Sequence, residues 1–172
     1  MRGRPPAGFG HYLRDMVYGS LDGVITTMAI VLASEGAGLS ARVALIMGLA
    51  NLAADGISMG ASNYLGLKSE IEQQQGSVSA EAPWRHGLAT VVAFVVIGSL
   101  PLIGYVLGAM GGARALPTAL VLSALGLCAA GAARAPYVGR HALASAAEML
   151  AVGALAGGTA YAVGALARMA VR

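Results

Sequence analysis

The sequence predicts an all-α integral membrane protein, a bundle of five membrane-spanning helices. Of its 172 residues, 57% are hydrophobic and only 11% are charged, whereas ordinary soluble domains are about 25% charged. The mean hydropathy is +0.71. Glycines and long alanine runs allow helices to approach closely in lipid. The alternating strand pattern of an outer-membrane barrel is absent from the sequence, so helices are the expected elements.

Five segments are long and apolar enough to cross a bilayer, which takes roughly 20 residues of helix. The second exceeds that length and ends in polar residues, so we expect its last turns to project into water. Pro101 predicts a kink in the third, because proline lacks the amide hydrogen that continues a helix. The five expected spans are 16–34, 40–66, 86–110, 114–134 and 144–168.

One transmembrane domain, residues 1–172, accounts for the chain, and 67–85 forms a short polar cytoplasmic linker. Five short helices make a small bundle for enclosing a hydrated path, so we expect a homodimer. Small residues four apart, which let membrane helices pack closely, give the candidate dimer contacts. These are Gly56 with Gly60, Gly104 with Gly108 and Gly112, and Gly153 with Gly157.

The basic residues predict the orientation, because cytoplasmic loops of membrane proteins carry an excess of Lys and Arg. The larger group lies inside if the N-terminus is cytoplasmic, and the C-terminus is then outside. The net charge of +3 is spread over segment ends, which argues against a nucleic-acid partner. Inside are Arg2, Arg4, Arg14, Lys68, Arg85, Arg134 and Arg140; outside are Arg42, Arg114, Arg168 and Arg172.

Acidic and polar residues interrupt the first two apolar segments. Asp22 lies in the first, and Asn51, Asp55 and Met59 follow at intervals of four in the second, on one helix face. A charge within hydrocarbon costs a few kcal/mol, so such groups usually face a bundle interior or a water-filled cavity. A carboxylate, an amide oxygen and a thioether suit borderline divalent metals better than Mg²⁺ or Ca²⁺. These four residues are the predicted metal ligands of a cation pathway, and Fe²⁺ and Mn²⁺ both fit.

Each of these residues also has a structural interpretation. Asp22 is a candidate cap near the start of a helix, and a lone methionine such as Met59 is usually packing material. Cys128 is alone and forms no intrachain disulfide, and His11, His86 and His141 are expected near membrane ends. The sequence contains no phosphate-binding loop, HExxH, GxSxG or paired-cysteine motif. It predicts neither an enzyme nor a resident cofactor.

Two stretches carry a resemblance to a known family: DGVITTMAIVLASEGAGLS and ALIMGLANLAADGISMGASNYLGLKSE. They are similar to the vacuolar iron transporter family, the ferrous iron and manganese carriers of plants, fungi and bacteria. The similarity continues through GSLPLIGYVLG and GAARAPYVGRHALASAAEMLAVGALAGGTAYAVGALA, and so covers nearly the whole chain. The DG and DGISMG motifs are its most specific parts.

The resemblance implies a five-helix protomer that dimerises, with the path between subunits lined by the first two helices of each. It implies that metal leaves the cytoplasm in exchange for protons. By position, Asp22 corresponds to the family's pathway aspartate and Met59 to its pathway methionine. Asn51 stands where plant members carry a glutamate, and we infer that Asp55, one turn away, takes its place.

The chain departs from the family in the loop after the second helix. Plant and fungal-type members carry there a cytoplasmic helical domain whose glutamates gather metal ions, and this chain keeps only Glu70, Glu72 and Glu81. Asn63 stands where many bacterial relatives have an acidic residue before the tyrosine. The resemblance therefore implies a short form of the transporter without the metal-capture domain and with a less acidic cytoplasmic mouth.

Together these observations predict a transporter that exports Fe²⁺, Mn²⁺ or both from the cytoplasm by proton antiport. Its expected partners are divalent metal ions, protons, the lipid bilayer and a second copy of the chain. A bacterial plasma membrane is the expected location, with a vacuole-like organelle as the alternative. Two other functions stay open: a passive divalent-cation channel, and a membrane adaptor that has kept the fold without transporting.

Overall fold

The structure, a computed structural model, describes residues 9–73, 82–110 and 114–170. All regular elements within these ranges are helical, which confirms the all-α prediction. In chain order they are η1 (Phe9–Tyr12), α1 (Leu13–Ala37), α2 (Ala41–Gln73), α3 (Pro83–Gly98), α4 (Leu100–Met110), α5 (Ala115–Val138) and α6 (Ala142–Ala170).

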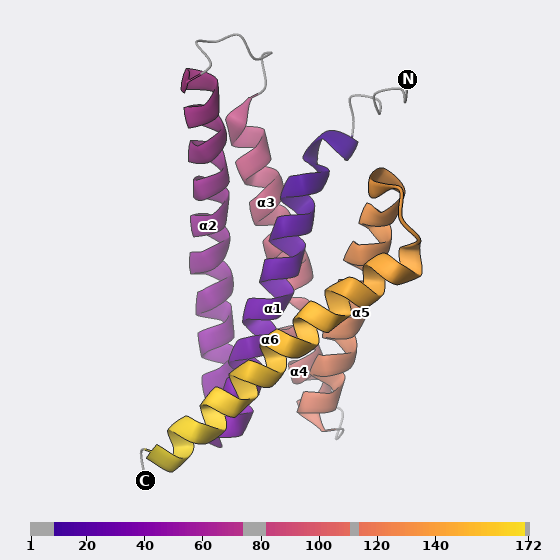
Figure 1. Cartoon of the computed structure of the whole chain (residues 1–172). Helices are drawn as coiled ribbons and strands as arrows, with labels where there is room; N and C mark the ends of the chain where they lie inside the picture. The colour runs from indigo at the N-terminus through magenta and orange to yellow at the C-terminus, as the bar shows by residue number, and fades with distance from the viewer. Residues whose placement is uncertain (1–8, 74–81, 111–113, 171–172) are drawn as a thin grey trace.

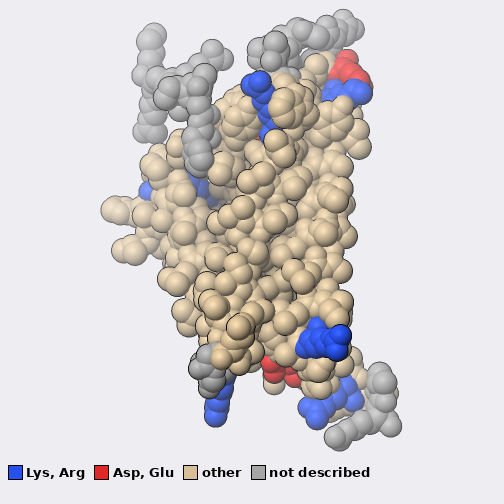
Figure 2. Space-filling view, turned by 180° about the vertical axis from the view of Figure 1, so that it is seen from behind, with Lys and Arg blue, Asp and Glu red and all other residues tan. Residues whose placement is uncertain are grey.

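Five helical stretches in the described residues are long and apolar enough to cross a membrane. Figure 2 shows that charged side chains on one face gather toward the two ends, with a broad uncharged band between them. Exposed apolar side chains along α2, α3, α4, α5 and α6 face outward, as lipid requires. The chain is therefore an integral membrane protein. The stretches are Gly10–Ala37, Ala41–Gln73, Pro83–Met110, Ala115–Val138 and Ala142–Ala170.

The helices extend beyond the ranges expected from the sequence. The expected linker, 67–85, is partly helical, because α2 continues to Gln73 and α3 begins at Pro83. Lys68 Nζ lies 3.8 Å from Glu72 Oε1 one turn on, a spacing at which opposite charges support an exposed helix. Pro83 suits the first turn of α3, where its missing amide hydrogen is not needed.

The third span is interrupted where the sequence predicts a kink. It consists of α3 and α4, which are separated at Ser99, two residues before Pro101. The Ser99 amide still donates to the carbonyl of Val95 at 3.0 Å, and the Ile103 amide donates to the carbonyl of Ser99 at 2.9 Å. Proline supplies no amide hydrogen at position 101, so the helical hydrogen bonding has a gap there.

Helix α1 is the centre of the bundle and contacts every other long helix. In Figure 1, α1 descends through the middle of the molecule, α2 and α3 lie to one side, α5 lies to the other, and α6 crosses it obliquely. The first and last residues that the structure describes, Phe9 and Ala170, lie at opposite ends of the bundle, as an odd number of spans requires. We call these the N-terminal end and the C-terminal end.

Glycines allow α1 and α3 to cross at backbone contact. A Cβ atom built on Gly98 would lie 2.8 Å from the Cα of Gly23, which is closer than real carbon atoms approach. The same is true of Gly19, whose missing side chain leaves room for the carbonyl of Thr90. Larger residues at this crossing would push the two helices apart, so these glycines set the position of α1 against α3.

The glycines expected to pack two protomers together instead pack helices within one protomer, and that prediction is wrong for the glycines that the structure describes. Those of α2 face Gly87 and Phe94 of α3, and those of α4 face α5. Those of α6 contact Leu127 of α5 and Leu32 of α1. A five-helix protomer needs its small residues for its own close contacts. The residues concerned are Gly56, Gly60, Gly104, Gly108, Gly153 and Gly157; Gly112 lies outside the described residues.

We predict that Gly98→Ala lowers the stability of the bundle by about 1–3 kcal/mol, the usual cost of overpacking. The added methyl group has to separate α1 from α3, because the backbone of Gly23 occupies its place. Thermal unfolding in detergent measures the effect. Gly158→Ala on α6 is the matched control, since its Cβ meets no atom within 4 Å. Equal melting temperatures for the two variants would contradict the predicted crossing.

Candidate metal pathway

The four predicted metal ligands lie on α1 and α2, away from both ends of these two helices. Asp22 projects from α1, while Asn51, Asp55 and Met59 follow one another along α2 at helical spacing. All four side chains are partly buried within the protomer. The buried stripe of α2 next to them consists of small or apolar residues that face α3 and α4, which turns the polar residues toward the edge of the α1–α2 contact.

Hydrogen bonds connect the two helices at this point. The side-chain amide of Asn51 donates to the hydroxyl oxygen of Thr26 at 3.3 Å. The Thr26 hydroxyl in turn donates to the backbone carbonyl of Asp22 at 2.8 Å. Asn51 therefore uses its amide hydrogens to bind α1, which leaves its carbonyl oxygen as the group able to contact a cation.

Asp22 and Asp55 interact electrostatically across the helix contact. Two carboxylates that face each other in a partly buried position repel when both are ionised, and a bound cation removes the repulsion. Within the described parts of the chain, no group of three or more His, Cys, Asp or Glu side chains is placed to hold a metal ion.

Met59 lies one turn beyond Asp55 and packs against the core cluster that contains Leu52 and Phe94. The structure therefore brings Asp22, Asn51 and Asp55 together and places Met59 beside them, partly within the packing of the protomer. A thioether sulfur is a soft ligand and binds Fe²⁺ or Mn²⁺ more weakly than carboxylate oxygens do.

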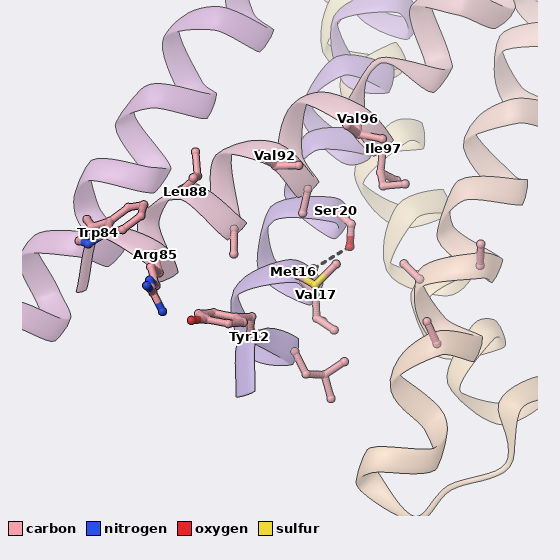
Figure 3. Close-up of a pocket in the computed structure, with 16 residues that line it drawn as sticks. Tyr12, Met16, Val17, Ser20, Trp84, Arg85, Leu88, Val92, Val96 and Ile97 are labelled. Carbon is pink, nitrogen blue, oxygen red and sulfur yellow. Dashed lines mark hydrogen bonds between the residues drawn. The ribbon is translucent and has the colours of Figure 1, made fainter. Parts of the chain in front are cut away.

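A large groove elsewhere in the protomer offers no such ligands. It has a volume of about 700 Å³ and lies between α1, α3 and α5. Figure 3 shows Val92, Val96 and Ile97 along it, with Tyr12 and Arg85 near one end. The Ser20 hydroxyl in its wall already donates to the carbonyl of Val17 at 3.2 Å. The lining is apolar and lacks carboxylates, so we do not assign cation passage to this groove.

Two other acidic residues of the spans, Glu148 and Glu35, have partners away from the pathway. Glu148 accepts hydrogen bonds from Arg134 at 3.0 Å and Arg140 at 2.9 Å near the N-terminal end. Glu35 accepts a hydrogen bond from the hydroxyl of Tyr105 at 2.7 Å near the C-terminal end. These contacts connect neighbouring helices at the ends of the bundle, which leaves Asp22 and Asp55 as the acids at mid-span.

The sequence profile of the VIT family matches this chain in two parts, residues 13–82 and residues 71–165. The chain belongs to the VIT family. The two matched parts overlap at residues 71–82, which connect the last turn of α2 to the start of α3. All four predicted ligands fall within the first part.

Relatives in this family cover different shares of the chain. A protein of Toxoplasma gondii named vacuolar iron transporter is 28% identical over 228 residues, covering 93% of this chain and 76% of its own length. Vacuolar iron transporter 1 of Oryza sativa subsp. japonica is 36% identical over 72 residues, which cover 42% of this chain and 29% of the relative. The vacuolar iron transporter of Plasmodium falciparum is 46% identical over 52 residues, covering 30% of this chain and 19% of the relative. The chain thus spans three quarters of the first relative and less than a third of the other two.

Sequence reasoning missed a buried polar cluster near the N-terminal end. It treats His86 as an interfacial residue, but the structure buries His86 against Asp15 of α1 and beside Asn63 of α2. Two spacings could have revealed it. Asp15 precedes Asp22 by two helical turns, and Asn63 continues the interval of four that runs from Asn51.

We predict that Asp55→Asn stabilises the metal-free protein by about 0.5–2 kcal/mol, as removing a functional strain often does. The substitution abolishes the repulsion with Asp22 while keeping the side-chain shape. Thermal unfolding with a chelator measures the gain. Added Mn²⁺ should then raise the melting temperature of the wild type more than that of the variant. A variant less stable than the wild type without metal would contradict the paired-carboxylate interpretation.

Proposed function

We propose that this protein is a transporter of divalent metal ions, with Fe²⁺ or Mn²⁺ as substrate. The observation that carries the proposal is the pair of carboxylates, Asp22 and Asp55, at mid-span in a bundle of five apolar helices. Charged groups at that depth are costly and serve substrate or ion passage in most membrane proteins. The names of the relatives, vacuolar iron transporter, support the same substrate class.

The ligand chemistry favours borderline divalent cations. Asp22 and Asp55 attract the partly hydrated ion, the carbonyl oxygen of Asn51 contributes a neutral ligand, and the thioether of Met59 selects against Mg²⁺. No histidine or cysteine is needed in this set. Fe²⁺ and Mn²⁺ both accept mixed oxygen and sulfur ligands, so either ion fits the proposal.

A homodimer completes the site in this proposal. The polar residues lie at an edge of the α1–α2 contact and remain only partly buried in one protomer. Small residues next to them on α2, including Ala53, Ala54 and Ser58, are exposed. A second copy placed there shields the carboxylates from lipid and doubles the number of ligands. Two-fold symmetry, the commonest arrangement of homo-oligomers, then places the path on the axis.

Proton exchange follows from the same carboxylates. Burial disfavours the charged form of a carboxyl group, so a proton and a metal ion compete for it. In this proposal the cation leaves the cytoplasm and protons enter, with the N-terminus cytoplasmic. The larger group of Lys and Arg side chains at the N-terminal end supports that orientation. The predicted location is a plasma membrane.

We predict that liposomes holding the purified protein take up Fe²⁺ and Mn²⁺ when a proton gradient is imposed, and that Asp22→Ala lowers the flux by about tenfold or more. Loss of a group that merely supports a metal ligand already costs about 10–100-fold in metal affinity or activity. Metal-sensitive and pH-sensitive dyes inside the liposomes measure both ions.

The matched control is Glu148→Gln, because surface ion pairs contribute little and this one lies away from the pathway. A metal flux that does not depend on the proton gradient would identify a passive channel. Liposomes that transport neither ion would identify an adaptor and contradict the proposal.

We predict that a cysteine introduced at Ala54 links two protomers by a disulfide, because the proposed two-fold axis runs beside α2. The native Cys128 is first replaced by serine. Mild oxidation in membranes followed by non-reducing electrophoresis measures the dimer. Leu125→Cys is the control, because it is exposed at 62% on α5, which lies on the other side of α1 from α2 (Figure 1). Linkage through position 125 alone would place the dimer contact on the wrong helix.

A further inference from the structure

A buried aspartate–histidine pair joins α1 to α3 near the N-terminal end. Asp15 is 1% exposed and His86 is 6% exposed. Nδ1 of His86 lies 2.6 Å from Oδ2 of Asp15, which is a short, charge-assisted contact. A buried ionisable pair in a membrane protein is costly to retain and usually has a role in the movement of ions or protons.

Asn63 and Thr90 hold the pair in one arrangement. The side-chain amide of Asn63 donates to Oδ1 of Asp15 at 2.8 Å and to the hydroxyl oxygen of Thr90 at 2.7 Å. The Thr90 hydroxyl donates to the carbonyl of His86 at 3.0 Å. Both oxygens of Asp15 therefore accept hydrogen bonds, one from Asn63 and one from the imidazole. What can still vary is whether the imidazole carries one proton or two.

The pair lies one ring away from the surface. The exposed ring of His11 and the ring of Tyr12 each lie 4.9 Å from the ring of His86, centre to centre. Arg14 Nε lies 3.7 Å from Oδ1 of Asp15. The rings of His11 and Tyr12 therefore lie between the pair and the surface at the N-terminal end. In the described residues, His11 and Tyr12 from η1 and Arg14 from α1 lie against the pair. Tyr64 of α2 and Arg85 of α3 are the sequence neighbours of Asn63 and His86.

The pair lies on the same side of the bundle as the metal ligands but shares no residue with them. Asp15 precedes Asp22 by seven residues, which places it on the same face of α1 roughly 10 Å away. Asn63 follows Met59 by one turn of α2. At this separation in a medium of low dielectric constant, the charge of one site still acts on the other.

We propose that Asp15 and His86 form a proton-binding site, separate from the metal ligands, that releases its proton when a metal ion occupies Asp22 and Asp55. With a doubly protonated imidazole the pair has a net charge of zero, and after loss of one proton it has a net charge of minus one. A divalent cation nearby favours the negative form, so the proton leaves toward the N-terminal end. The effect is reciprocal: a proton bound at the pair weakens metal binding.

This inference rests on the proposed function, because it assigns a site for the exchanged proton. It differs from direct competition at the metal-binding carboxylates, since removal of His86 leaves every metal ligand in place. The two mechanisms therefore predict different numbers of protons released per metal ion bound.

The test counts protons released when Mn²⁺ binds to the full chain in lipid nanodiscs. Calorimetry in two buffers with different heats of ionisation gives that number. We expect His86→Gln to bind Mn²⁺ but to release fewer protons than the wild type. The reason is that a glutamine side chain, unlike an imidazole, neither takes up nor releases a proton. His141→Gln is the matched control, since His141 is exposed at the same end of the bundle. Equal proton release by the wild type and His86→Gln would overturn the proposal.

A second measurement does not depend on a folded variant or on metal transport. Nuclear magnetic resonance of ¹⁵N-labelled histidine in the wild type reports whether each ring carries one proton or two. We expect the His86 ring to gain a proton as pH falls in the metal-free protein. A ring that keeps one protonation state throughout would overturn the proton site. If the wild type binds no Mn²⁺ while His86 still titrates, the proposed function fails and the proton site stands.

Discussion

The backbone contact between α1 and α3 is the constraint on which the rest of the bundle depends. Gly19 and Gly23 of α1 and Gly98 of α3 have no side chains at the crossing, so the two helix backbones come into direct contact. Asp22, next to Gly23, consequently projects away from this contact toward α2. The position of the carboxylate thus follows from the packing of its glycine neighbour, and a looser crossing would change where the charge lies.

The sequence was sufficient to predict the class and the number of membrane spans, because length and hydropathy control membrane insertion. It also located the break near Pro101, which results from a missing amide hydrogen. It failed on the role of the glycine pairs, since spacing shows that a helix face is small but not which helix covers it. Gly60 illustrates this: its neighbour is Gly87 of the same protomer, a pairing that depends on the whole bundle.

For the site, too, the sequence predicted what depends on local helical geometry and missed what depends on contacts between helices. The interval of four along α2 placed Asn51 and Asp55 on one face correctly, because helical geometry is local. The hydrogen bond from Asn51 to Thr26 and the burial of His86 depend on contacts between helices that are distant in sequence. An isolated histidine near a membrane end gives no local sign that an aspartate 71 residues earlier will bind it.

Helix α2 has 33 residues, and at about 1.5 Å per residue it is roughly 50 Å long, against about 30 Å of hydrocarbon. Its last turns, with Lys68 and Glu72, therefore form a rigid stalk beyond the lipid at the point where the two matched parts of the family profile meet. A folded module inserted after Gln73 would be carried on this stalk without disturbing a single helix contact inside the bundle. Insertion or deletion of a soluble domain after α2 is therefore compatible with an unchanged bundle of membrane helices.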